Sequence, residues 1–167
     1  MGIKVRAARK EDAGHLADII VKSWKSAYSE LIPEDEITRY LDKDRRKVQF
    51  EKFIEDGEIV LIGIFNEVPC GLVFANKDND EGLESCGSIY SIYLLEETWG
   101  KGISAKLMEQ TVELLKKQGC KKISLWVYEE NLRARKFYEK HGFTFDGSKK
   151  YSRFSNKPLE LRYIKCL

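Results

Sequence analysis

The sequence has no closely spaced cysteines, no excess of charge of one sign and no long hydrophobic run. Its four cysteines stand far apart with no C-x-x-C pair, so neither a zinc site nor a disulfide framework is expected. Its longest apolar run, residues 59–65, is far shorter than the roughly 20 residues that span a bilayer. We therefore expect no metal and no membrane association.

The balance of positive and negative charge indicates which kinds of partner are not expected. The 29 Lys and Arg residues nearly match the 27 Asp and Glu residues, which gives a net charge of +2 and argues against a nucleic-acid partner. The segment MGIKVRAARKED at residues 1–12 lacks the apolar stretch of a secretory signal. We expect a cytoplasmic protein with reduced cysteines.

The length and composition predict one globular domain over residues 1–167. Hydrophobic residues make up 43% and charged residues 34% of the chain, which is enough apolar surface for a core. A chain of 167 residues leaves little room for two domains.

Alternating and helical hydrophobic patterns predict the elements. Strands are expected near residues 3–8, 58–65, 71–75, 88–95, 122–128, 143–145 and 158–166. Helices are expected at 11–24, from 33, at 48–57, at 103–119 and at 132–140, with polar loops at 76–82 and 147–157. We summarise the order as β-α-α-β-β-β-α-β-α-β-β, an α/β fold with a mixed, mostly antiparallel twisted sheet and helices on both faces.

A glycine turn at residues 100–102 is the centre of the functional hypothesis. It follows a predicted strand and opens into the helix that begins at Ile103. Glycines allow a ligand to come close to the backbone. The first N–H groups of a helix have no partner within the helix, and they lie at the positive end of its dipole. This arrangement suits a phosphate or pyrophosphate.

The same glycines also fit an ordinary tight turn and the fingerprint of a dinucleotide site, whereas they do not fit a Walker site. Residues 100–105 match G-x-G-x-x-A, but a dinucleotide loop follows the first strand of its fold, and this turn comes after a predicted hairpin. No Gly-Lys-Ser/Thr triplet has the Walker spacing. Both nucleotide interpretations are poor.

A later segment makes the pattern more specific. LLEETWGKGIS at residues 94–104, followed by NLRARKFYEKHGF at residues 131–143, resembles the GCN5-related N-acetyltransferase (GNAT) family. The motifs cover roughly residues 58–145, and the element order is similar over the whole chain. The resemblance implies an acyl-CoA N-acyltransferase fold that binds acetyl-CoA and transfers its acetyl group to an amine.

The resemblance implies that the glycine turn holds the CoA pyrophosphate. The family pattern R/Q-x-x-G-x-G/A falls on Trp99, Gly100, Lys101, Gly102, Ile103 and Ser104. Trp99 replaces the usual Arg or Gln, and Ser104 replaces the last Gly or Ala. Cationic residues on the 132–140 helix, Arg133 among them, stand beside this anion site.

The resemblance further implies contacts to the pantetheine arm. The backbone of Ile92, Tyr93 and Leu94 is expected to pair with the arm as an added strand does. Asn131 matches a family residue that bonds the pantetheine region, and from the residues alone it is equally an N-cap.

Tyr138 matches the family tyrosine that protonates the departing CoA thiolate; the alternative is a core side chain. Many relatives have a glutamate as base where this chain has residues 87–91, and none is present here. We expect deprotonation of the amine through ordered water, with Tyr90 or Glu130 as helpers. His15 and His141 are expected to be structural or solvated.

The acceptor is predicted from less specific features. Trp24 and Tyr28 lie in the segment that covers the acceptor pocket in the family, and an aromatic patch there could bind the acceptor. For these two residues an aromatic core is an equal alternative. Tyr90 is also expected to bind the acceptor. WKSAYSELIPEDEI at residues 24–37 is similar to a segment of bacterial small-molecule and polyamine acetyltransferases. These features predict direct transfer to a small amine or polyamine, without an acetyl-cysteine intermediate.

Three points stay open. The acceptor could instead be a protein N-terminus or lysine, or the chain could be a CoA-binding sensor without activity. Edge strands at the C-terminus also suggest a homodimer.

Overall fold

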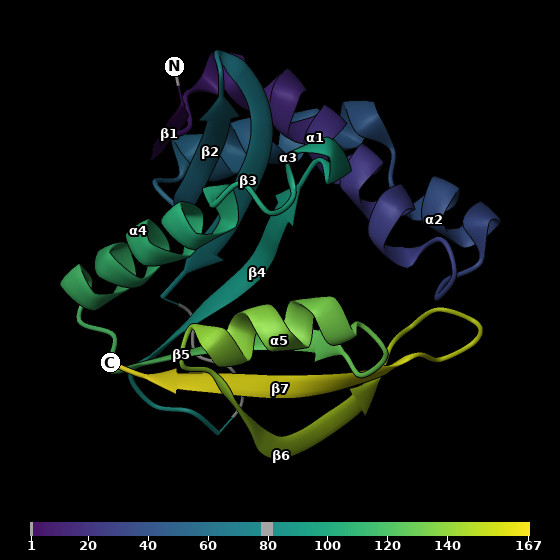
Figure 1. Cartoon of the computed structure of the whole chain (residues 1–167), viewed down its shortest axis with the longest axis vertical. Coiled ribbons are helices and arrows are strands. Elements are labelled where there is room, and N and C mark those ends of the chain that lie inside the picture. Colours follow the sequence, from purple (N-terminus) through teal and green to yellow (C-terminus); the bar gives the residue numbers. More distant parts are fainter. Residues whose placement is uncertain (1, 78–81) are drawn as a thin grey trace.

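A computed structural model of the chain describes residues 2–77 and 82–167 and shows one seven-stranded sheet in the order β1-β2-β3-β4-β5-β7-β6 (Figure 1). The strands are β1 (Ile3–Ala7), β2 (Ile59–Phe65), β3 (Val68–Asn76), β4 (Cys86–Leu94), β5 (Lys122–Tyr128), β6 (Thr144–Tyr151) and β7 (Leu159–Cys166). Among these strands β4 and β5 run parallel, and every other neighbouring pair is antiparallel. The predicted mixed, mostly antiparallel sheet is confirmed.

Helices cover both faces of the sheet, as predicted (Figure 1). They are α1 (Ala13–Tyr28), α2 (Glu34–Tyr40), α3 (Lys43–Glu55), α4 (Ile103–Lys117) and α5 (Leu132–Lys140). The buried side chains of α1, α2 and α3 share one cluster, the α1 cluster, and those of α4 and α5 share the other, the α4 cluster. Within the described ranges, no helix has the length and apolar character needed to cross a bilayer.

Strand β2 shows how the sequence divides between the two clusters. Ile59 and Leu61 pack in the α4 cluster, whereas Val60 and Ile62 pack in the α1 cluster. Successive side chains of a strand point to opposite faces, so a strand covered on both sides is apolar throughout.

The summarised order counted two helices between the first two strands, although helical stretches were expected at 11–24, from 33 and at 48–57, and the structure has three helices there. Helix α2 ends at Tyr40, and the carboxylate of Asp42 then accepts a hydrogen bond from the backbone N–H of Arg45 at 3.0 Å. Asp42 therefore caps a separate helix, α3.

The predicted boundaries of strands and loops are least accurate in the polar regions of the chain. Strand β6 extends to Tyr151, well into the predicted loop at 147–157, because Lys149, Lys150 and Tyr151 pair with β7. Their backbone bonds do not depend on side-chain hydrophobicity, so the pattern gave no sign of them. Of the other predicted loop, 76–82, residues 78–81 lie outside the described residues.

The parallel pair at the centre of the sheet is short. Strands β4 and β5 pair from Cys86 to Ser88 and separate beyond Ser88. Gly87 lies beneath α4 in this junction, where a Cβ would lie 2.9 Å from a methyl carbon of Leu115. Beyond the junction, Tyr90 forms a bulge, because Ile89 and Ser91 oppose the consecutive β3 residues Ala75 and Phe74. A bulge bends its strand, and here it lies where β4 turns away from β5.

Candidate functional site

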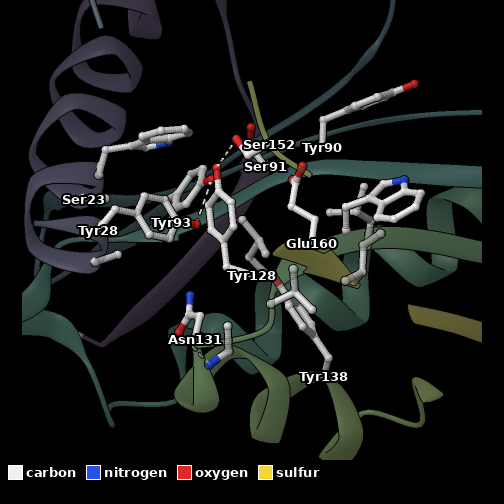
Figure 2. Close-up of a pocket in the computed structure, with 18 of the residues that line it drawn as sticks. Ser23, Tyr28, Tyr90, Ser91, Tyr93, Tyr128, Asn131, Tyr138, Ser152 and Glu160 are labelled. Atoms are coloured by element: carbon white, nitrogen blue, oxygen red, sulfur yellow. Dashed lines mark hydrogen bonds between the residues drawn. The ribbon is translucent and has the colours of Figure 1, made fainter. Parts of the chain in front are cut away.

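A cavity of about 890 Å³, the central cavity, occupies the opening between β4 and β5 (Figure 2). One part of its lining, the α5 end, comprises Trp99, Ser104, Ala134, Phe137 and Tyr138. The other part, the aromatic end, comprises Trp24, Tyr28, Tyr40, Tyr93, Tyr128 and Phe154. The apolar residues of the α5 end pack in the α4 cluster and those of the aromatic end in the α1 cluster, so the cavity passes through the sheet.

The glycine turn lies beside the α5 end. Gly100 and Gly102 have φ angles of 75° and 86°, which glycine adopts without the cost that a Cβ brings. A Cβ at Gly100 would meet no atom within 4 Å, so the turn is open on that side. In the described structure, the N–H groups of residues 100–102 donate to no other backbone group. Together with the first N–H groups of α4 they form an anion site.

Trp99 holds a cationic side chain from α5 next to this turn. Its indole Nε1 donates to the carbonyl of Leu94 at 3.2 Å, which fixes the ring. The guanidinium carbon of Arg133 on α5 lies 3.4 Å from the centroid of that ring. A cation therefore stands beside the turn although the residue at position 99 is not itself cationic.

The edge of β4 that faces the opening carries unpaired backbone groups. The N–H of Leu95 donates to Cys70 at 2.8 Å, so Leu95 and, two residues earlier, Tyr93 direct their backbone groups to β3. Ile92 and Leu94 direct theirs to the opening. The carbonyl of Leu94 already accepts from Ser23 Oγ at 3.0 Å as well as from Trp99. Of the predicted backbone contacts, Ile92 and the N–H of Leu94 have suitable geometry, while Tyr93 offers its side chain.

Asn131 and Tyr138 both line the α5 end of the central cavity (Figure 2). Asn131 Oδ1 accepts from the N–H of Ala134 at 3.2 Å, so this side chain is the N-cap of α5 and also borders the cavity. Tyr138 is 9% exposed, and burial raises the pKa of its hydroxyl well above the ordinary value. The hydroxyl is therefore a proton donor, not a base, near neutral pH.

Phenols and one indole pack closely together in the aromatic end. The hydroxyls of Tyr28 and Tyr93 lie 3.3 Å apart, and the Trp24 and Tyr28 rings pack edge-on at 4.8 Å between centroids. Burial raises the pKa of Tyr93 to about 12 and that of Tyr128 to about 12. Trp24 and Tyr28 thus line the cavity and are also part of the core, and their role in binding the acceptor stays a prediction.

Tyr90 and Glu130, the predicted helpers, occupy different places. Tyr90 lines the cavity from the bulge, and its ring stacks on Phe74 at 5.3 Å between centroids. Glu130 is exposed and is not among the lining residues. His15 and His141 also lie outside the lining.

The sequence reasoning missed the contribution of the chain around β7. Ser152, Arg153 and Phe154, from the loop between β6 and β7, line the cavity, and so does Glu160 on β7. Glu36 on α2 accepts from Ser155 in that loop, which ties the loop to the α1 face. The alternation of Leu159, Glu160 and Leu161 was the available signal, since it places Glu160 on the face opposite to Leu161.

The charge of the lining is uneven. Glu160 is its single carboxylate, whereas Arg133, Lys150 and Arg153 are cationic. None of the lining residues is a cysteine, and the described residues contain no group of three His, Cys, Asp or Glu side chains that could hold a metal ion.

Comparison with known proteins agrees with this geometry. The profile of the Acetyltransferase (GNAT) family matches residues 14–143. The chain belongs to the GNAT family. Its N-acetyltransferase relatives include YuaI of Bacillus subtilis, an uncharacterized N-acetyltransferase that is 28% identical over 137 residues, 77% of this chain and 73% of the relative.

Two further matches, one to a sequence and one to a crystal structure, come from Thermoplasma acidophilum. A spermidine N(1)-acetyltransferase is 27% identical over 155 residues, 86% of this chain and 89% of the relative. The crystal structure of a PaiA N-acetyltransferase in complex with coenzyme A superposes with a TM-score of 0.83 at 19% identity, and the match covers 100% of both chains. The N-acyltransferase fold of this chain is therefore that of the family.

Proposed function

We propose that this GNAT protein transfers the acetyl group of acetyl-CoA to a small primary amine by direct attack. The observation that carries the proposal is the central cavity. Its α5 end, lined by Trp99, Ser104 and Tyr138, lies beside the glycine turn on one face of the sheet, and its aromatic end lies on the other face. Two reactants that enter from opposite faces meet in the opening between β4 and β5. Positioning of two bound reactants accounts for a large part of such a reaction's acceleration.

The α5 end fits acetyl-CoA as cosubstrate. The N–H groups of residues 100–104 would hold the pyrophosphate, and charge-assisted hydrogen bonds of this kind contribute about 1.5–3 kcal/mol each. The backbone groups of Ile92 and the N–H of Leu94 would bind the amide groups of the pantetheine arm, as in strand addition. Asn131 borders the same space and holds the start of α5, which carries Tyr138.

Tyr138 is the proposed acid. A thiol has a pKa of about 8.5, so the CoA thiolate is a fair leaving group and needs only moderate help. The Tyr138 hydroxyl is protonated at neutral pH, where burial raises its pKa further above the ordinary value of about 10, so it has a proton to give to sulfur. The lack of a lining cysteine supports direct transfer over an acetyl-cysteine route.

The aromatic end is the proposed acceptor site. Faces of Trp24, Tyr28 and Tyr93 suit the apolar body of an amine and attract its ammonium group. The spermidine acetyltransferase among the relatives makes a polyamine a candidate, but three cationic side chains and one carboxylate in the lining favour an acceptor with a single ammonium group.

An acceptor screen that follows release of free thiol tests the proposal. The panel contains benzylamine, tyramine, 1,4-diaminobutane, spermidine and peptides with free N-termini or lysines, each with acetyl-CoA. We expect the monoamines to be acetylated faster than spermidine. Faster reaction of the peptides would favour a protein acetyltransferase, whereas CoA binding without turnover of any amine would identify a sensor module.

A further inference from the structure

We infer that Glu160 is the general base that takes the proton from the acceptor's ammonium group. This inference rests on the proposed transfer to an amine and assigns the base that residues 87–91 do not supply. The carboxylate comes from β7, on the far side of the opening from β4, and Figure 2 shows it projecting into the central cavity.

The position of Glu160 follows from the register of the sheet. On β7 it pairs with Tyr128 of β5 on one side and with Lys150 of β6 on the other. Leu161, the next residue, is buried in the α4 cluster, so Glu160 points to the opposite face, which is the face of the aromatic end. The carboxylate therefore stands where the acceptor amine enters.

Its chemical state suits proton transfer. In the described part of the chain, no hydrogen bond or ion pair within 4.0 Å occupies the carboxylate, although it is the only acidic group that lines the cavity. A carboxylate that is partly buried and not engaged by a cation can exchange protons with a bound ligand, whereas one held in an ion pair cannot do so readily.

Burial and the surrounding charges shift the pKa of Glu160 in opposite directions. Burial raises the pKa of Glu160, and the cations of Lys150 on β6 and Arg153 in the β6–β7 loop oppose that rise. The other titratable groups at this end are phenols: Tyr28 on α1, Tyr40 on α2, Tyr93 on β4 and Tyr128 on β5. Burial raises the pKa of Tyr93 and of Tyr128 to about 12 and that of Tyr28 well above its ordinary value, so these three carry no charge that would compete with Glu160 near pH 7. A base whose pKa moves toward neutrality is better matched to proton transfer at physiological pH.

The step balances in atoms and in charge. Glu160 takes one proton from the ammonium group, and the freed nitrogen lone pair forms the C–N bond at the thioester carbonyl carbon. The C–S bond breaks with its electron pair on sulfur, and Tyr138 gives that sulfur a proton. The second nitrogen proton restores the Tyr138 hydroxyl, and Glu160 releases its proton to water, so one proton is released for each amide formed.

The test compares Glu160→Gln with the wild-type protein and with Glu113→Gln, which removes a carboxylate from the exposed surface of α4. Each protein is assayed for thiol release with the best amine of the panel as a function of pH. It is assayed again with 2,2,2-trifluoroethylamine, which is neutral at pH 7. Binding of CoA, followed by thermal shift, reports whether the variant is folded.

We expect Glu160→Gln to lower kcat/KM for the protonated amine about 10²-fold at pH 7 and to bind CoA as the wild-type protein does. The loss should shrink as pH rises toward the amine's pKa and should be small with trifluoroethylamine. Equal activity of Glu160→Gln and wild type, or an equal loss at every pH and with both amines, would overturn the inference. A wild-type protein that acetylates no amine would instead refute the proposed function itself.

Discussion

The guanidinium of Arg133 stacks on the indole of Trp99, with 3.4 Å between the guanidinium carbon and the ring centroid. Trp99 occupies the position where the family pattern has Arg or Gln. The stack places a cation from α5 next to that position, so a side chain from another element supplies the charge. Burial lowers the pKa of Arg133, opposed by Glu96, but an arginine remains charged at any physiological pH.

This stack predicts that Arg133→Ala weakens CoA binding. Loss of the cation that stacks on Trp99 beside the pyrophosphate site should raise the Kd of CoA by about 5–30-fold, or about 1–2 kcal/mol, and the effect should diminish at high salt. Isothermal titration calorimetry at two salt concentrations measures both. Lys136→Ala, which removes an exposed cation from the same helix, should change the Kd by less than about twofold. Equal effects of the two substitutions would show that only net charge matters.

Tyr138→Phe is expected to separate catalysis from stability. Loss of a positioned acid should lower kcat by about 10²-fold, while the Kd of CoA stays nearly constant. The hydroxyl has no hydrogen-bond partner among the described residues, so the free energy of unfolding should change by less than about 1 kcal/mol. Steady-state kinetics between about pH 6 and pH 9 and urea unfolding provide the two measurements. Unchanged turnover across that range would remove Tyr138 from the mechanism.

Sequence reasoning located what depends on local pattern. The strand expected at 122–128 and the helix expected at 103–119 differ little from the observed β5 and α4. Local periodicity and the glycines at the ends of α4 are enough to predict these bounds. The glycine turn, Trp99 and Tyr138 belong to contiguous motifs. In the structure Trp99 and Tyr138 line the central cavity, and the turn lies beside it. Their individual roles, like the dimer and the cytoplasmic location, stay predictions.

What the sequence did not reveal depends on pairing between distant segments. Glu160 reaches the cavity only because β7 inserts between β5 and β6, and Arg133 reaches Trp99 only because α5 lies beside the glycine turn. The extension of β6 to Tyr151 likewise comes from its pairing with β7. Neither hydrophobic periodicity nor a short motif contains that information.

Two glycine-to-alanine changes, one at the junction of β4 and β5 and one in α1, should change the free energy of unfolding in opposite directions. At Gly87, a Cβ would meet Leu115 at 2.9 Å and the backbone oxygen of Asn76 at 3.2 Å, so Gly87→Ala should lower the free energy of unfolding by about 1–3 kcal/mol. Gly14 in α1 has no atom within 4 Å of such a Cβ, and Gly14→Ala should raise it by about 0.5–1 kcal/mol. Urea unfolding of both variants measures the contrast. A stabilised Gly87→Ala would contradict the close packing at the junction.

The pairing of Arg6 with Asp12 predicts a pH-dependent contribution to stability. The guanidinium makes two hydrogen bonds to the carboxylate, at 2.7 and 3.1 Å, and the N–H of Arg9 adds a third at 2.7 Å. The hydrogen bond from Arg6 is the largest cause that lowers the pKa of Asp12 below its ordinary value. A lowered folded-state pKa means that the stabilisation is present above the unfolded pKa of about 3.9 and is lost as pH falls through the folded value.

Asp12→Asn should therefore lower the free energy of unfolding by about 1–2 kcal/mol at pH 7, and the difference from wild type should vanish as both approach about pH 2. Asp35→Asn is the matched control, because the Asp35 side chain is 75% exposed in its ion pair with Arg39. Its effect should stay below about 0.5 kcal/mol. Urea unfolding at a series of pH values measures both variants. A difference for Asp12→Asn that stays constant down to the lowest pH would show that packing of the side chain, not its charge, holds β1 to the start of α1.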